Sequence, residues 1–104
     1  MSEIELMRQI LEPLLEDYHY WFERSQRLLE KESLDDLIPS QEQAALMGRI
    51  QESQAELMAA ESLYKLSDSE VGIDPGLMAK WHRLLMECAE LGRRFRLRTP
   101  SPEA

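Results

Sequence analysis

The chain has 104 residues, of which 43% are hydrophobic and 31% are charged, a composition that suits one folded domain and leaves no room for a second core. The formal net charge is −8, and residues 1–80 alone carry seventeen acidic against seven basic side chains, a balance of −10. This balance argues against nucleic acid as a partner, because phosphate contacts need dense lysine and arginine. With one cysteine, no apolar stretch of about 20 residues and an acidic start, we expect a cytoplasmic protein without disulfide, signal peptide or transmembrane segment.

The first predicted helix covers residues 3–32. Ser2 and Glu5 have the spacing of a capping box, in which the first side chain accepts a backbone N–H and the second reaches back. Pro13 interrupts the pattern, so the helix either kinks there or is split near Leu11. We expect the kink, because the heptad phase is unchanged across the proline. The apolar line at 3–4 spacing consists of Ile4, Met7, Leu11, Leu14, Tyr18, Trp21, Ser25 and Leu28.

Two further helices are predicted at 41–66 and 75–97. Ser40 and Gln43 suggest a second capping box, and Asp74 and Pro75 suit the start of the third helix. Short connections make consecutive helices antiparallel neighbours, so residues 1–98 are expected to form one all-α antiparallel three-helix bundle. Such helices can also pair across a dimer into a larger helical body. Residues 99–104 are expected to form a flexible tail.

The pairing of large with small residues follows from folding the helices back on one another. A turn centred near residue 36 places Trp21 opposite Ser53, and a turn centred near residue 71 places Trp81 opposite Ala60. Large residues facing small ones fill a core without strain. We therefore expect both tryptophans to pack against small side chains of the second helix.

Possible chemical sites are sparse, and no cofactor is expected. Glu16 and His19 have the Glu-x-x-His spacing of di-iron bundles, but such sites need a second copy of that motif, and no acid lies three residues before His82. A metal site at Glu16 and His19, or a cofactor held between helices, remains an alternative. Cys88 falls on the apolar line of the third helix, which favours a buried hydrophobe over a nucleophile. We therefore expect a protein without enzymatic activity.

A second, sparser apolar line lies on the outside of the first helix. Tyr18, Trp21 and Phe22 can face the core together, so Tyr20 has to point away from it. Leu6, Pro13 and Leu34 share the heptad position of Tyr20. Exposed apolar lines with an aromatic residue are typical of binding faces, although single exposed apolar residues are common on any surface. We expect this line to contact a protein partner or a second copy.

The third helix ends in a basic cluster that consists of Arg93, Arg94, Arg96 and Arg98. Cations at a helix C-terminus stabilise the helix, which by itself is a sufficient explanation. The alternative is a patch that meets an acidic partner or, weakly, an anionic membrane surface. A peripheral membrane-surface protein is therefore a further alternative to the adaptor.

Two groups of sequence strings resemble a small family of uncharacterised proteins from cyanobacteria. The first group is EPLLED at 12–17 and YWFERS at 20–25, and the second is VGI at 71–73, WH at 81–82 and EC at 87–88. The similarity covers most of residues 5–95. It carries over no catalytic or binding residue, because the family is a domain of unknown function. It implies a cyanobacterial setting and an accessory or assembly role, with photosynthetic complexes at the thylakoid surface as an expected location.

Overall fold

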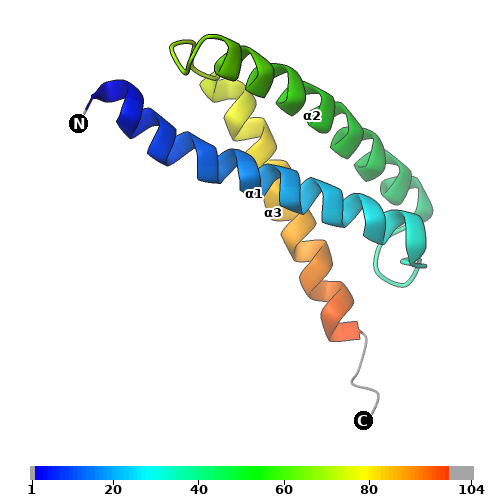
Figure 1. Cartoon of the computed structure of the whole chain (residues 1–104). Coiled ribbons are helices and arrows are strands. Elements are labelled where there is room, and N and C mark those ends of the chain that lie inside the picture. The colour runs from blue at the N-terminus through cyan, green and yellow to red at the C-terminus, as the bar shows by residue number, and fades with distance from the viewer. Residues whose placement is uncertain (1, 99–104) are drawn as a thin grey trace.

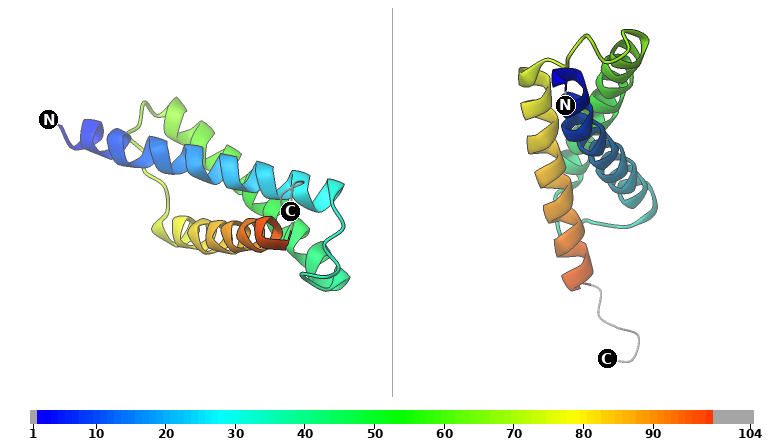
Figure 2. Two further views of the ribbon diagram at one scale, coloured as in Figure 1. Left: turned by 90° about the horizontal axis from the view of Figure 1, so that it is seen from below. Right: turned by 60° about the vertical axis from the view of Figure 1, so that its left-hand side comes forward.

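The computed structural model describes residues 2–98, which form three α-helices and no strand. Helix α1 spans Glu3–Lys31, α2 spans Ser40–Leu66 and α3 spans Pro75–Arg98, each end within one residue of the expected range. Helix α1 packs against both other helices, whereas α2 and α3 touch over a shorter stretch. The C-terminal half of α3 projects past α1 (Figures 1 and 2). The expected all-α three-helix bundle is confirmed, and the expected tail lies outside the described residues.

Helix α1 begins at the predicted cap and runs through its proline. The Ser2 hydroxyl oxygen accepts the backbone N–H of Glu5 at 3.1 Å. Pro13 lies inside one continuous helix, so the alternative of a helix split near Leu11 is wrong. Pro13 has no N–H to donate to the Gln9 carbonyl, four residues earlier in the helix. Gln9 is exposed, so water can hydrate that carbonyl instead.

The predicted capping box of α2 is wrong. Ser40 is already the first helical residue, and the N-cap is Pro39, which makes no side-chain hydrogen bond. The Gln43 amide instead donates to Asp35 Oδ1 at 2.9 Å and to the Ile38 carbonyl at 3.0 Å. Gln43 therefore closes the α1–α2 connection rather than capping the helix.

The core is built around Trp81, which is fully buried. The Trp81 ring meets the Tyr18 ring edge-to-face at 5.9 Å, and its indole N–H donates to Glu56 Oε1 at 3.3 Å. All three helices and the α1–α2 connection contribute to this core. Its other members are Leu15, Phe22, Leu34, Leu46, Ile50, Leu57, Leu84, Cys88 and Leu91.

The helices pair at different levels from those expected. Hydrogen bonds join His19 to Glu61 and Gln26 to Gln54. Residue 40 is the midpoint of the chain between the partners in both pairs, so the α1–α2 turn is centred there. The pairs Arg49–Glu87 and Lys80–Glu56 both centre the α2–α3 turn on residue 68.

The expected opposition of Trp21 to Ser53 and of Trp81 to Ala60 is therefore wrong. Trp81 is level with Glu56, to which it is hydrogen-bonded. Lys31, the last residue of α1, is level with Arg49, so the first turns of α2 extend past the end of α1. The α1–α2 connection is thus not the symmetric turn that the reflection assumes.

Candidate functional site

Tyr20 is the most prominent aromatic residue on the surface, with 54% of its area exposed, as predicted. Its ring packs edge-to-face against Trp21 at a centroid distance of 5.3 Å. The Arg24 guanidinium lies 5.3 Å from the centre of the Trp21 ring and donates to the Tyr20 hydroxyl at 3.1 Å. Because Arg24 follows these two aromatic residues by four and three positions on α1, one turn of helix holds all of them together.

Helix α3 extends this cluster through Gly92 and Arg96. A Cβ atom placed on Gly92 would lie 3.9 Å from Trp21 Cζ3 and 3.6 Å from Arg96 Nη1. The Trp21 ring and the Arg96 guanidinium therefore both lie beside the glycine. Trp21 is only half-buried, and it borders α3 instead of lying in the core line where the sequence placed it. We call Tyr20, Trp21, Arg24 and Arg96 the aromatic–arginine face.

In the part of the chain that the structure describes, neither arginine of this face is ion-paired, in contrast to Arg93 of α3. Within residues 2–98, neither Arg24 nor Arg96 makes an ion pair with a carboxylate. Arg93 pairs with Glu90 at 2.7 Å, and hydrogen bonding to that carboxylate raises the pKa of Arg93. The face thus carries two guanidinium groups that remain available to a partner's acids.

Arg94 and Arg98 bind the α1–α2 connection. Arg94 donates to the Leu37 carbonyl at 2.8 Å, and Arg98 donates to the Ser33 carbonyl at 2.8 Å. Arg98 also pairs with Asp36 at 2.6 Å. These contacts fasten the end of α3 to a loop distant in sequence, a role that the local sequence of the basic cluster does not reveal.

The predicted outer apolar line on α1 holds only in part. Leu6 is 51% exposed and Pro13 is exposed, like Tyr20. Leu34 is fully buried, so its assignment to the exposed line is wrong. The helix has ended before Leu34, and the connection folds this side chain into the core, with the N–H groups of Leu37 and Ile38 donating to its carbonyl.

The alternative metal ligands lie apart from the aromatic–arginine face. His19 Nε2 contacts Glu61 Oε1 of α2 at 3.1 Å, a partner that the Glu-x-x-His pattern does not name. The described residues contain no group of three or more histidine, cysteine, aspartate or glutamate side chains that could hold a metal ion. Cys88 is buried, and that burial raises the pKa of its thiol, which disfavours the reactive thiolate.

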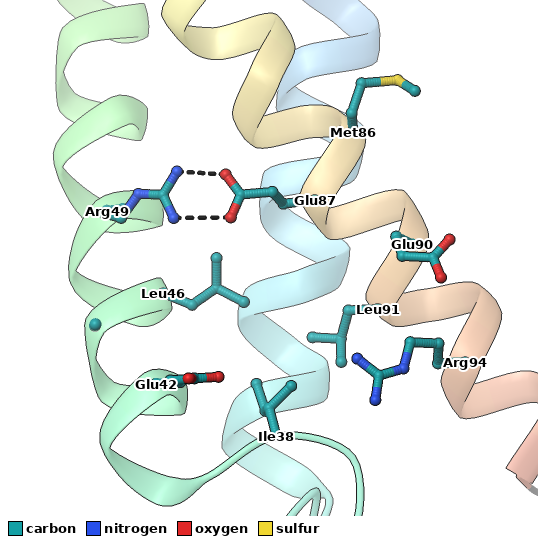
Figure 3. Close-up of a pocket in the computed structure, with 10 residues that line it drawn as sticks. Ile38, Glu42, Leu46, Arg49, Met86, Glu87, Glu90, Leu91 and Arg94 are labelled. Atoms are coloured by element: carbon teal, nitrogen blue, oxygen red, sulfur yellow. Dashed lines mark hydrogen bonds and ion pairs between the residues drawn. The ribbon is translucent and has the colours of Figure 1, made fainter.

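A groove of about 570 Å³ separates the first half of α2 from the second half of α3. Arg49 and Glu87 form an ion pair across its upper end (Figure 3). Hydrogen bonding to Arg49 lowers the pKa of Glu87. The groove leaves no signal in the sequence, because it arises from the way α3 diverges from α2. Its apolar lining comes from Ile38, Ala45, Leu46, Met86 and Leu91.

Fold and surface together define the class, an all-α three-helix protein that presents an ordered aromatic and cationic face. The model of a family described as "Protein of unknown function (DUF2605)" matches residues 1–97, and the chain belongs to that family. The resemblance to an uncharacterised family is therefore confirmed. Neither a curated protein nor a solved structure matches the chain. None of the described helices is long and apolar enough to cross a membrane.

Proposed function

We propose that this chain is a non-enzymatic adaptor or assembly protein that docks onto another protein through the aromatic–arginine face. The observation that carries the proposal is the contact of exposed Tyr20 with half-buried Trp21 and Arg24, with exposed Arg96 near Trp21. Tryptophan, tyrosine and arginine are the residues most enriched at the energetic centres of protein interfaces. Here they lie together on one surface.

The internal contacts of the face favour tight binding. Arg24 is already fixed by the Tyr20 hydroxyl and the Trp21 ring, so less side-chain entropy is lost on association. The guanidinium groups of Arg24 and Arg96 can each form charge-assisted, bidentate hydrogen bonds with a carboxylate. The partner that fits this face is therefore a protein with an apolar contact residue and nearby acidic side chains.

The setting that we propose is the cytoplasm, with photosynthetic complexes at the thylakoid surface as the site of action. The resemblance of residues 5–95 to a cyanobacterial family motivates this setting, and the acidic charge of the chain disfavours direct contact with anionic lipid. The chain would then reach the membrane surface through its partner.

Affinity purification of the tagged chain from its native host, followed by mass spectrometry, tests the proposal. Wild-type protein should capture a discrete partner, and Tyr20→Ala should lower the yield of that partner at least about tenfold. Arg27→Gln is the matched control, because Arg27 is exposed on the same helix and pairs with Glu23. Tyr20→Ala should change the free energy of unfolding by no more than about 0.5 kcal/mol.

Other outcomes of these experiments would contradict the proposal or favour a different function. Unfolding of Tyr20→Ala, or an unchanged yield of partner, would contradict docking through this face. Metal or a cofactor spectrum in the eluate would favour the ligand-binding bundle. Flotation with anionic liposomes that disappears on replacing Arg94 and Arg96 with Gln would favour a membrane-surface protein.

A further inference from the structure

Helix α3 has a second outward line, on a different side from Arg96. Met86, Glu90, Arg93 and Leu97 follow one another at spacings of four, three and four, so they form one ridge on the helix. Met86 is 57% exposed and Leu97 is 72% exposed. We call these four residues the α3 ridge.

The part of α3 that carries the ridge is accessible. In the C-terminal half of α3, Leu91 and Gly92 are buried against the rest of the molecule, whereas Glu90, Arg93 and Leu97 are exposed, and the end of the helix projects past α1 (Figures 1 and 2). Met86 and Glu90 lie at the outer rim of the groove, whereas Glu87 reaches across it to Arg49 (Figure 3). A helix from another molecule can therefore approach along the ridge.

The ridge is complementary to itself under a two-fold axis. The midpoint between Glu90 and Arg93 is also the midpoint between Met86 and Leu97. Two antiparallel copies of α3 related by an axis at this point place Glu90 opposite Arg93 of the second copy, twice, and Met86 opposite Leu97 of the second copy, twice. A parallel arrangement would place like charges opposite each other, which is unfavourable.

We propose that the α3 ridge binds a second copy of this chain, forming an antiparallel two-fold dimer. This inference goes beyond the proposed function, because the dimer uses the ridge and leaves Tyr20 and Arg24 of α1 uncovered. The assembly would then present two aromatic–arginine faces, one from each copy.

The attraction between the two copies comes mainly from the two contacts between Met86 and Leu97 at the ends of the ridge. Glu90 and Arg93 already pair within one helix, at 2.7 Å and 3.0 Å, so the dimer exchanges internal ion pairs for pairs between copies. Those charges set the register and orientation, while burial of Met86 and Leu97 favours association. A contact between single helices is small, and we expect a dissociation constant on the order of 10 µM.

Charge reversal at the ridge tests the dimer by sedimentation equilibrium of the full chain. The wild type should shift from monomer to dimer between about 1 and 500 µM protein. In the dimer of Glu90→Arg, each of the two central pairs between copies would consist of two arginines. In the dimer of Arg93→Glu, each of these pairs would consist of two glutamates. Each single variant should therefore remain monomeric over the same range.

Mixing the two single variants gives the decisive result. In the mixed pair every arginine of the ridge faces a glutamate, so an equimolar mixture should recover the dimer. Glu23→Arg and Arg27→Glu reverse a comparable exposed pair on α1 and should leave the dimer unchanged. Far-UV circular dichroism should show the same helical content in all variants, because all four side chains are exposed.

The proposal would be overturned by a monomeric wild type at about 500 µM, by dimerisation of either single variant, or by a mixture that stays monomeric. Loss of the dimer in the α1 control variants would place the contact elsewhere and would also overturn it. Partner capture through Tyr20 is measured separately, so failure of the dimer leaves the proposed function to its own test.

Discussion

At the scale of single residues, Leu34 shows how a buried side chain outside a helix closes the core. It lies in the α1–α2 connection, is fully buried, and packs in the same cluster as Trp81 and Leu91. Leu34→Ala should lower the free energy of unfolding by about 2–5 kcal/mol, because it removes a packed side chain and leaves a cavity. Leu6→Ala, at an exposed position of α1, should change it by no more than about 0.5 kcal/mol. Urea unfolding measures both, and equal effects would contradict this account of the core.

The sequence could not predict the position of Leu34. The count that grouped it with Tyr20 assumes helical geometry, and α1 ends at Lys31. Within the helix the same count correctly places Tyr18 and Phe22 in the core and Tyr20 on the surface, but it also places Trp21 in the core line, where the structure leaves that side chain half-buried. A prediction from helical periodicity therefore applies only to residues that lie within the helix.

At the scale of whole elements, α2 contains a glycine that its structure does not require. Gly48 lies inside the helix at an exposed position, and a Cβ atom placed on it would have no neighbouring atom within 4 Å. Gly48→Ala should therefore stabilise the protein by about 0.5–1 kcal/mol, because alanine loses less backbone entropy in a helix. Urea titration measures the gain, and a neutral or destabilising result would contradict an open helical site at this position.

Gly76 in the first turn of α3 provides the contrast. A Cβ atom there would lie 2.9 Å from Asp74 Oδ2, the oxygen that accepts the N–H of Leu77 and caps the helix. Gly76→Ala should gain less than Gly48→Ala, since the cap has to shift. The two variants together separate helix propensity from capping geometry.

Element boundaries were more predictable than the levels at which elements pair. Helix formers, Ser2 and Asp74 define helix ends locally, and the α3 cap at Asp74 forms as expected, with a Leu77 N–H to Asp74 Oδ2 distance of 3.0 Å. The pairing levels depend on how the connections fold, and Arg94 and Arg98 fix the α1–α2 connection from the far end of α3. Such long-range contacts leave no periodic signal. For the same reason Arg96 could be named from sequence, but its position beside Trp21 could not.

At the scale of the whole molecule, the ion pair between Arg49 of α2 and Glu87 of α3 makes the stability of the fold depend on pH. Arg49 of α2 and Glu87 of α3 form a bidentate pair, and hydrogen bonding to Arg49 lowers the pKa of Glu87 below its ordinary value of 4.5. Because the folded state binds this proton less readily than the unfolded chain does, the pair stabilises the fold above pH 4.5, and this contribution is lost as the pH falls through the lowered pKa.

Replacing Arg49 with Met should therefore lower the free energy of unfolding at neutral pH and have a diminishing effect in acid. The loss at pH 7 should be below about 1 kcal/mol, because about half of each side chain is exposed and solvent screens the pair. Urea titrations from about pH 7 down to about pH 2.5 should show the two curves converging as Glu87 becomes protonated. Arg83→Met, at an exposed position of α3, is the control and should run parallel to the wild type. A gap between wild type and Arg49→Met that stays constant down to the lowest pH would mean that Arg49 acts through packing along the groove and not through the charge of Glu87.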